Sequence, residues 1–517
     1  MRWRSKLPPI KLAFKAWWPA LLAGGLHTLS FAPWRAWPLQ ILTLAWLARA
    51  SLQATPKAAA GLGWRFGLAW LSSGLWWLYI SLHDYGDIAA PLAAGAVLLL
   101  AGFLSLYYGA ALALAAWLNR RAGASPAWAG LCWAACWLLA ELARATWLTG
   151  FPWIASGYAH TVGPLAAWAP WIGVYGITGL AACLAAGLAQ LLGATPTWRL
   201  SARGALSGLG LALLALGAAL PNEFTHSTGR IRISALQPDV PQDDKFNQAL
   251  WDANLDALSS QIEQARGDLV LSPETVVPLP LYDLRPRQMQ RLDDAAHRRP
   301  LLLGTFLGNE QVGYVNSLIG WGTPDGRRYD YGKHHLLPFG EFVPWGFHWF
   351  VEGLHIPMVD QARGLHQRPF RIAGQRIRPL ICYEDLFGED FVQSVVGMDA
   401  ATVLVNVSNL AWFGRIMVQD QHLQFSVMRA LEFQRPFVRS TNTGATAALD
   451  HRGQVLARLP PDRPGILECE VEGREGSTPY ARWLAALGLW PLWLLALVPL
   501  LLQLWRGLRG LRSQSRP

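Results

Sequence analysis

The sequence predicts a multi-pass α-helical membrane domain joined to a globular α/β domain. Composition supports the first part, because the 517-residue chain is 52% hydrophobic, only 15% charged and contains 28 Trp, which departs from the usage of soluble proteins. Long apolar stretches fill the beginning and the end of the chain, as transmembrane helices require. Between them, residues 222–480 alternate short apolar runs with amphipathic ones, a pattern that is typical of an α/β layered domain.

Eight apolar stretches approach or exceed the roughly 20 residues that cross the hydrocarbon core of a bilayer. They cover residues 12–30, 31–48, 61–82, 88–118, 126–148, 162–193, 204–221 and 482–505. Pro33 and Pro38 interrupt the second stretch, which can therefore form a tight or re-entrant hairpin with the first. We expect residues 1–221 to form a transmembrane domain of about seven spans. Residues 481–517 are expected to form a C-terminal transmembrane helix and a basic cytoplasmic tail.

The cations predict the orientation of these spans, because Lys and Arg in short loops resist translocation. One set of flanks is rich in cations, whereas the alternate loops offer little beyond Arg35 and Arg144. The cationic flanks are residues 2–15, 49–65, 120–121, 199–203 and 506–516. Both termini are therefore predicted to be cytoplasmic, with residues 222–480 on the external side. The same flanks explain the formal net charge of +10, so we expect no nucleic-acid partner.

The cysteines argue against a disulfide framework and against a metal site. Cys132, Cys136 and Cys183 lie in apolar stretches, so that only Cys382 and Cys469 remain outside them. Cys132 and Cys136 share a helical face, but no His or acidic residue accompanies them as a further ligand. We therefore expect neither a metal nor a cofactor.

The pattern of residues 222–480 predicts strands and helices in alternation. Strands are expected at residues 230–236, 268–271, 301–305, 315–320, 377–382, 402–406 and 437–441, and helices at residues 247–265, 286–298, 388–396 and 417–434. Glu274, Cys382 and Asn409 each come at or just after the end of one of these strands. Because ligand sites of α/β sheets gather at the carboxyl ends of strands, this placement favours a shared site.

An acid, a cation and a thiol are the parts of an acyl-transfer site. A free cysteine has a pKa of about 8.5, so a nucleophilic Cys382 needs a base or a nearby cation to supply thiolate. Glu274 can be that base, while Lys333 and nearby backbone amides can bind the oxyanion of a tetrahedral intermediate. The alternative is structural, with Cys382 as a buried thiol, Glu274 as a loop acid and Lys333 as a solvated cation. Glu341 and Glu384 also allow two interpretations: they are either acceptors that stabilise the fold or residues of the site.

Several short motifs carry a resemblance to a known family. They are Phe151-Pro-Trp153, Pro338-Phe-Gly-Glu341-Phe-Val-Pro344, Ile381-Cys-Tyr-Glu-Asp385, Trp412-Phe-Gly414, Gln421-His422, Met428-Arg-Ala-Leu-Glu432 and Thr441-Asn-Thr-Gly444. Together with the order Glu274, Lys333, Cys382 they make the chain resemble the apolipoprotein N-acyltransferase family, a membrane-bound branch of the carbon-nitrogen hydrolase (nitrilase) superfamily. The resemblance covers almost the whole chain. It implies that residues 222–480 fold as a nitrilase-like αββα sandwich and form a periplasmic catalytic domain.

The resemblance also implies the roles of single residues. Cys382 would be the nucleophile, Glu274 the general base and Lys333 the stabiliser of the intermediate. The supporting site residues would be Glu341, Tyr383 and Glu384. The chain departs from the residues usual in the family at three positions, where Trp, Trp and Asp are replaced by Ser272, Phe246 and Leu410.

The implied reaction moves an acyl chain from a phospholipid to Cys382 as a thioester, and then to the free α-amino group of the S-diacylglyceryl cysteine of an apolipoprotein. It takes place at the outer face of the bacterial inner membrane. The expected partners are the phospholipid donor, the diacylglyceryl apolipoprotein acceptor and the membrane, and the protein is expected to be a monomer. Two other interpretations remain: a membrane-anchored amidase or nitrilase that hydrolyses a C–N bond, and a catalytically dead lipoprotein-binding scaffold.

Overall fold

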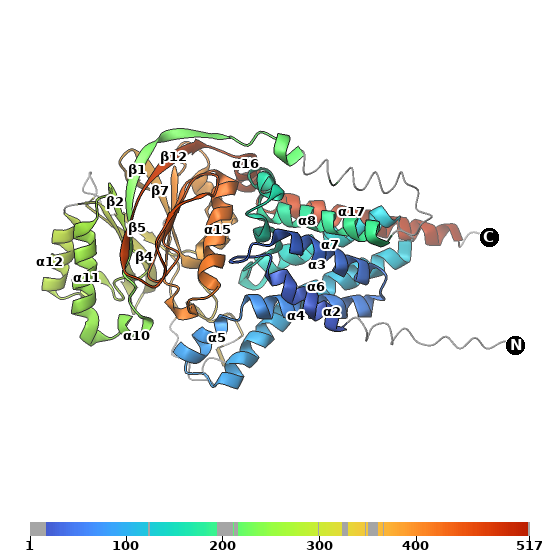
Figure 1. The fold of residues 1–517 in the computed structure, drawn as a ribbon, viewed down its shortest axis with the longest axis horizontal. Coiled ribbons are helices and arrows are strands. Elements are labelled where there is room, and N and C mark those ends of the chain that lie inside the picture. Colours follow the sequence, from blue (N-terminus) through green and yellow to red (C-terminus); the bar gives the residue numbers. More distant parts are fainter. Residues whose placement is uncertain are drawn as a thin grey trace.

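The computed structural model describes residues 17–122, 125–193, 210, 216–297, 299–322, 329–346, 348–349, 360–365 and 367–514. Figure 1 shows two parts that lie end to end: a layered part built from two β-sheets with covering helices, and a bundle of long helices. The bundle is formed by the first helices of the chain and by the last one. The layered part is therefore inserted between two segments of the same bundle.

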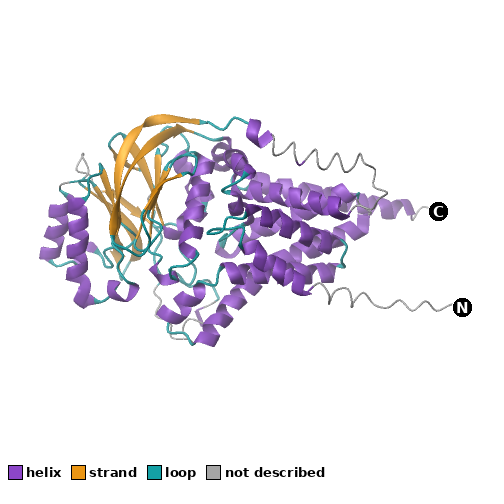
Figure 2. Cartoon of the chain, viewed as in Figure 1, coloured by secondary structure: helices purple, strands orange, loops and turns teal. Residues whose placement is uncertain are grey.

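Two six-stranded sheets form the layered part (Figure 2). Their strands are β1 (Thr225–Gln237), β2 (Leu269–Leu271), β3 (Leu301–Asn309), β4 (Gly313–Trp321), β5 (Tyr329–Gly332), β6 (Phe370–Ile372), β7 (Gln375–Ile381), β8 (Val403–Ser408), β9 (Phe437–Thr441), β10 (Ala447–Leu449), β11 (Val455–Arg458) and β12 (Gly465–Gly476). The first sheet has the order β12-β1-β2-β3-β4-β5 and the second the order β11-β10-β9-β8-β7-β6. In each sheet three neighbouring strands are parallel, β1-β2-β3 and β7-β8-β9, and antiparallel strands complete both edges.

An apolar core fills the space between the sheets. Ile233 and Leu271 of the first sheet belong to the same buried cluster as Ile377 and Val405 of the second. Strands that are buried on both faces have continuous apolar runs instead of strict alternation, which is why Leu269–Leu271 is apolar throughout. All seven predicted strands are confirmed within one to several residues at their ends.

Helices cover both outer faces, which completes the αββα sandwich. Leu258 of α11 (Trp251–Gln264) and Leu292 of α12 (Pro286–Ala296) pack in one buried cluster with residues of the first sheet. On the second sheet lies α15 (Val418–Phe433), which is buried on nearly every side because the helical bundle packs against its other face. The α/β fold predicted from the sequence is confirmed.

The bundle contains α2 (Trp17–Thr28), α3 (Trp37–Leu52), α4 (Pro56–Gly74), α6 (Ala90–Ala122), α7 (Pro126–Thr146), α8 (Ala169–Gly193) and α17 (Trp490–Gln514). Within the described residues, four helical segments are long and apolar enough to cross a membrane: Ala90–Arg121, Pro126–Thr149, Pro164–Leu192 and Trp490–Arg509. These segments agree with four of the predicted spans.

The other four predicted spans are not confirmed by the same criterion. Residues 31–48 and 61–82 correspond to α3 and α4, of 16 and 19 residues, neither of which meets the same criterion of length and hydropathy. The stretch 12–30 is described only from Trp17 onward, as α2, and most of 204–221 lies outside the described residues. The count of eight spans therefore stays a prediction.

Glutamine side chains of α15 join the sandwich to the bundle. Gln421 Oε1 accepts hydrogen bonds from the indole N–H groups of Trp77 at 3.1 Å and Trp153 at 2.7 Å, and its Nε2 donates to the carbonyl of Gly74 at 3.2 Å. Gln424 Oε1 accepts from the backbone N–H of Ala32 at 3.0 Å. Because these amides are buried, each must keep its partner, and so they fix the position of one part relative to the other.

A buried ion pair in α7 holds the loop that follows this helix. Arg144 donates to Glu141 at 2.8 Å and to the carbonyls of Phe151 and Trp153 at 2.7 and 3.0 Å. Glu141 in turn accepts from the backbone N–H of Ser156 at 3.1 Å and from its hydroxyl. Both charged side chains are fully buried, so the pair and its hydrogen bonds define the path of the loop over the end of the bundle.

We predict that Glu141→Ala destabilises the protein by about 3–5 kcal/mol, because it leaves the charge of Arg144 buried without the opposite charge of a carboxylate. The free energy of unfolding in detergent, measured by denaturant titration, checks this value. Asp252→Asn is the matched control, since the pair of Asp252 with Arg285 is exposed on both sides and is worth at most about 1 kcal/mol. Equal losses in the two variants would contradict a structural role for the buried pair.

Candidate active site

Glu274 lies just after the end of β2, in the run Ser272-Pro273-Glu274. Its side chain is buried, and its two carboxylate oxygens accept hydrogen bonds from different elements. Oε1 accepts from Asn316 Nδ2 at 2.7 Å, and Oε2 accepts from the backbone N–H of Asn409 at 2.8 Å. These donors hold the carboxylate in one orientation, as a general base requires.

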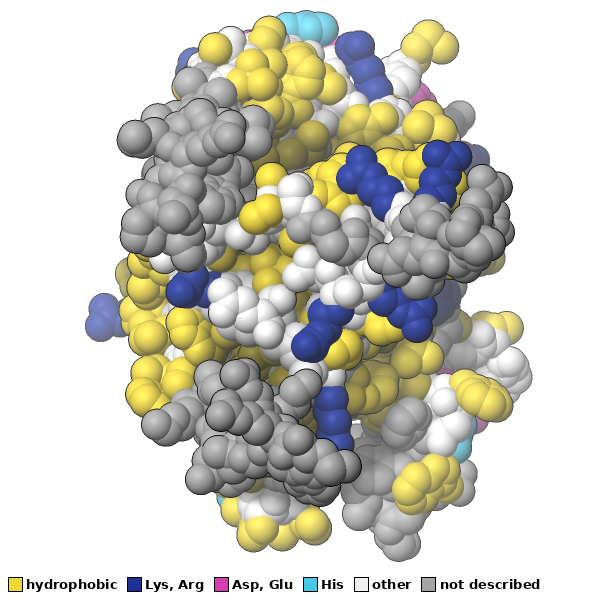
Figure 3. All heavy atoms as spheres, turned by 90° about the vertical axis from the view of Figure 1, so that its right-hand side faces the viewer, with side chains coloured by type: hydrophobic (Ala, Val, Ile, Leu, Met, Phe, Trp, Pro, Cys, Tyr) yellow, Lys and Arg dark blue, Asp and Glu magenta, His cyan; other side chains and the backbone are white. Residues whose placement is uncertain are grey.

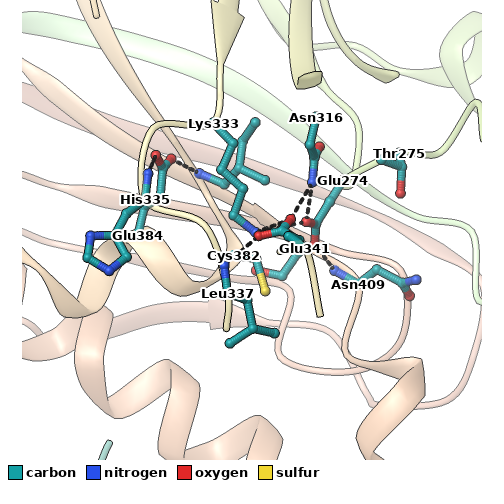
Figure 4. Close-up of polar contacts among 12 residues, drawn as sticks. Glu274, Thr275, Asn316, Lys333, His335, Leu337, Glu341, Cys382, Glu384 and Asn409 are labelled. Carbon is teal, nitrogen blue, oxygen red and sulfur yellow. Dashed lines mark hydrogen bonds and ion pairs between the residues drawn. The ribbon is translucent and has the colours of Figure 1, made fainter. Parts of the chain in front are cut away.

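Lys333 follows directly after β5 and is almost completely buried. Its Nζ lies 2.7 Å from Oε1 of Glu341 and 3.5 Å from Oε1 of Glu274 (Figure 4). Burial lowers the pKa of Lys333, but the charges of Glu341 and Glu274 outweigh it and hold this pKa above its ordinary value. Lys333 is therefore a fixed cation between two carboxylates.

Cys382 is the first residue after β7, and Figure 4 shows its sulfur beside the cluster of Lys333, Glu274 and Glu341. Its φ of +51° lies in the left-handed region, which costs a non-glycine residue roughly 1–3 kcal/mol. Burial raises the pKa of the Cys382 thiol well above its ordinary value, and the charge of Glu274 raises it further, although Lys333 acts in the opposite direction. At neutral pH the sulfur therefore carries a proton, which a base must remove as the sulfur attacks.

The backbone of Cys382 is held by two side chains. Its carbonyl accepts hydrogen bonds from Asn406 Nδ2 at 2.9 Å and from His422 Nε2 at 3.1 Å. The other ring nitrogen of His422, Nδ1, lies 2.6 Å from a guanidinium nitrogen of Arg439, which can only donate. Nδ1 must therefore accept, and the proton of the neutral imidazole sits on Nε2. Burial lowers the pKa of His422, which agrees with this neutral form.

Glu341 and Glu384, both predicted site residues, have different surroundings. Glu341 contacts Lys333 directly and belongs to the charged cluster. The carboxylate of Glu384 instead accepts four hydrogen bonds within the fold, from the hydroxyl of Tyr331 and from three backbone N–H groups, those of His334, His335 and Ile381. Glu384 thus holds together the two segments that carry Lys333 and Cys382.

Tyr383 connects the site to the loop of the helical bundle. Its hydroxyl donates to the carbonyl of Gly150 at 3.3 Å, and its ring lies nearly parallel to that of Trp153 at 6.5 Å between centroids. The ring of Trp153 also stacks on His422 at 5.8 Å. Cys382 therefore lies next to the part of the candidate site that the bundle supplies.

Two residues that the sequence analysis did not select belong to the cluster. Asn316 donates from one amide nitrogen to both Glu274, at 2.7 Å, and Glu341, at 3.2 Å. Lys245 donates to the carbonyl of Glu274 at 3.2 Å and to the hydroxyl of Thr275 at 2.9 Å. No sequence pattern marks Asn316, and Lys245 has no distinguishing signal either, because its burial becomes visible only in the structure.

Lys245 balances the charge of the cluster. Glu274 and Glu341 carry two negative charges and Lys333 only one positive charge, which a buried site tolerates poorly. Burial lowers the pKa of Lys245 to about 8, although the charge of Glu274 acts in the opposite direction. Lys245 is therefore charged at neutral pH, and the four groups together are close to neutral.

Ser272, Phe246 and Leu410 stand where the resemblance implies Trp, Trp and Asp, and each lies within two residues of Glu274 or beside a residue that contacts it. Ser272, which is buried, accepts from the backbone N–H of Gly304 at 3.0 Å. Phe246 follows Lys245 and is about half exposed, with its ring 6.3 Å from that of Trp412. Leu410 follows Asn409 and is buried. All three residues therefore lie close to Glu274, whose carboxylate contacts Asn316, Asn409 and Lys333.

This arrangement contains the groups that acyl transfer needs: a partly buried thiol, a fixed carboxylate that can take its proton, and a cation that can stabilise an oxyanion. In the described part of the chain, no three His, Cys, Asp or Glu side chains are placed to hold a metal ion. The arrangement is specific enough to compare with known families.

Two family descriptions match the chain. Residues 23–187 match the N-terminal domain of apolipoprotein N-acyltransferase, and residues 247–480 match the carbon-nitrogen hydrolases. The apolipoprotein N-acyltransferase of Ralstonia nicotianae is 46% identical over 92% of this chain and 91% of that protein. The chain belongs to the apolipoprotein N-acyltransferase family. The family members of Verminephrobacter eiseniae and Pseudomonas putida are 44% and 37% identical and cover 92% and 95% of this chain, and 94% and 97% of their own lengths.

Family membership also decides between the interpretations of the sequence. An acyltransferase of the carbon-nitrogen hydrolase superfamily is supported, whereas the amidase and the dead scaffold are not favoured. Among solved structures, a carbon-nitrogen hydrolase superfamily protein of Xanthomonas campestris with an arsenic adduct in its active site is 20% identical. It covers 50% of this chain and 96% of its own, with a TM-score of 0.35. The apolar helices and the family together identify a membrane protein.

We predict that the rate of Cys382 acylation falls as the pH rises through about 8. Above that pH Lys245 loses its charge, and the remaining excess of negative charge opposes the oxyanion. In Lys245→Arg the guanidinium stays charged, so the decline should move to a higher pH. The two proteins are compared by the pH at which the rate declines. The maximal rate is not compared, because the larger Arg side chain also changes the packing near Glu274. Lys57→Arg, at an exposed lysine of α4, is the control, and an unshifted decline in Lys245→Arg would contradict the role given to Lys245.

Proposed function

We propose that this protein transfers an acyl chain from a membrane phospholipid, through a thioester on Cys382, to the α-amino group of the S-diacylglyceryl cysteine of apolipoproteins. The observation that carries the proposal is the convergence of Lys333, Glu274 and Glu341 beside Cys382 in a buried site that touches the helical bundle. The relatives of this chain bear the name of that activity over nearly their whole length.

In the first half of the reaction the Cys382 sulfur attacks the ester carbonyl of the phospholipid. Glu274 takes the thiol proton as the C–S bond forms, and Lys333 with nearby backbone N–H groups stabilises the resulting oxyanion. The C–O bond then breaks, and Glu274 returns the proton to the leaving oxygen. Lysophospholipid departs, and the acyl chain remains on Cys382 as a thioester.

In the second half the neutral α-amine of the apolipoprotein attacks the thioester carbonyl. Glu274 accepts a proton from the nitrogen, the C–S bond breaks, and the proton passes to the sulfur, which restores the thiol. Water would compete with the amine at this stage, so the burial of Glu274 and Lys333 favours transfer over hydrolysis. Both substrates are anchored in the bilayer, which raises their effective concentration at a site attached to it.

The proposal includes the location of the protein. The cationic flanks favour a multi-pass protein of the bacterial inner membrane with residues 1–221 as the transmembrane domain, residues 222–480 as the periplasmic catalytic domain and residues 481–517 as a final span with a cytoplasmic tail. The whole site is built from one chain, which supports a functional monomer.

We predict that Lys333→Met slows acylation of Cys382 by about 10²- to 10³-fold, the usual effect of removing one oxyanion donor. The fold should persist, because Glu274 and Glu341 then face each other and one of them can bind a proton instead. Single-turnover acylation by labelled phospholipid measures the rate, and circular dichroism checks the fold. A rate like that of the unmodified protein would refute the role of Lys333.

The decisive experiment is mass spectrometry of the purified protein after incubation with phospholipid alone. We expect a mass increase of one acyl chain on Cys382, which persists in water and disappears when a diacylated lipopeptide is added. Cys469→Ala should behave like the unmodified protein, whereas Cys382→Ala should gain no acyl chain. Rapid discharge to free fatty acid without lipopeptide would instead indicate a hydrolase, and full biological function of Cys382→Ala would indicate a scaffold.

A further inference from the structure

A polar pocket lies at the end of the helical bundle that is remote from Cys382. It has a volume of about 200 Å³ and is lined by residues from the ends of α3, α6 and α8 and from the start of α7. Among them are the cation Arg49 and the amides Gln53, Asn119 and Gln190. Helix α6 has 33 residues, so its two ends are roughly 50 Å apart. This distance separates the pocket from the acyl-transfer site, and a lipid bound in it cannot be the acyl donor at Cys382.

No acidic side chain compensates the cations at this end. In residues 1–221 and 481–517 the only acidic residues are Asp84, Asp87 and Glu141. Glu141 contacts Ser156 beside the catalytic part, and the two aspartates lie just before the start of α6, which is also at that end. Figure 3 looks onto the opposite end, where Lys and Arg side chains are spread across the visible face.

The partial charges of the helix ends do not neutralise these cations. Among the described helices, α3, α6, α8 and α17 finish at this end with about half a negative charge each, and α2, α4 and α7 begin here with about half a positive charge each, so the sum is roughly half a negative charge. Arg49, Arg120 and Arg121 supply three positive charges. The surroundings of the pocket therefore keep a clear positive excess that an external anion can balance.

Three arginines of this face lie over tryptophan rings. Arg121 lies 4.4 Å above the ring of Trp117, Arg506 4.5 Å above Trp128 and Arg509 3.6 Å above Trp505. Arg49 and Arg120 have no ion pair, side-chain hydrogen bond or aromatic partner among the residues that the structure describes, and of these two only Arg49 lines the pocket.

The amides add donors to the pocket. Asn119 uses one N–H for the carbonyl of Leu52, and Gln53 and Gln190 also line the hollow. Orientation of a protein in a membrane requires only cations in loops, and it gives no reason for a hollow lined by amides beside one unpartnered guanidinium.

We propose that this pocket binds the phosphate group of an anionic phospholipid in the leaflet opposite the active site. A guanidinium matches the oxygens of a phosphate with two parallel hydrogen bonds, and the amides can donate to the remaining oxygens. The source is a lipid, because the pocket lies between apolar helices, and the same end of the bundle carries three Arg-Trp pairs of the kind that sit at headgroup level. Such a lipid would tie α3, α6, α7 and α8 together at the end that the catalytic part does not brace.

Binding is tested with the full-length protein in a zwitterionic detergent, by native mass spectrometry and by the midpoint of thermal unfolding during titration with phosphatidylglycerol. We expect one tightly bound phosphatidylglycerol and a rising midpoint, with a weaker effect of phosphatidylcholine. Arg49→Gln should lower the affinity roughly tenfold or more, since a charge-assisted contact is lost. Arg509→Gln removes the same charge from the same face and should change the affinity by less than about threefold.

Each other outcome overturns the proposal. Equal losses in Arg49→Gln and Arg509→Gln would show a diffuse basic surface without a site. Stabilisation by inorganic phosphate or glycerol phosphate at the concentration at which phosphatidylglycerol acts would assign the pocket to a soluble anion.

If Arg49→Gln fails to fold, Gln190→Leu takes its place, and unchanged affinity in that variant counts against the site. Acylation of Cys382 in detergent without added phosphatidylglycerol should be the same in Arg49→Gln, so failure here is distinguishable from failure of the proposed function.

Discussion

The burial of several charges in one place is the constraint on which the rest of the structure depends. Lys333 is surrounded by Glu274 and Glu341, with Lys245 behind the first carboxylate. Buried charges are stable only when each one is paired and hydrogen-bonded, so the elements that carry them have little freedom to move apart. The same burial keeps the thiol of Cys382 protonated until a base takes its proton. Stability and chemistry thus both depend on this cluster.

The second determinant is the contact between the sandwich and the bundle. Helix α15 packs on the second sheet with one face and on the bundle with the other, and Gln421 hydrogen-bonds residues of two bundle segments. Through Trp153 and Gly150 the bundle touches Tyr383, the residue after Cys382. A soluble hydrolase domain would need neither contact. Here they hold the candidate site against the helical bundle.

The candidate site was predictable where its residues follow apolar strands. Glu274 and Cys382 stand directly after strands of the two sheets, and the carboxyl ends of parallel strands are where ligand sites gather. Lys333 was found as the cation that completes a set of acid, cation and thiol, and Glu341 through the motif of residues 338–344. Asn316 could not be found, because an asparagine within a strand has no distinguishing pattern, and Lys245 could not be found because a lysine is normally solvated. Short strands such as β6 and β10 were also missed, since three residues show no period.

The sequence by itself determined the division into an apolar bundle and an α/β part, the class of chemistry and the family, because hydropathy, strand periodicity and short motifs are local properties. Only the tertiary structure decided which charges meet, that Glu384 braces the site while Glu341 enters it, and that the imidazole of His422 carries its proton on Nε2. These facts depend on contacts between residues that are far apart in the chain, and distance in space is set by packing, which no local pattern encodes.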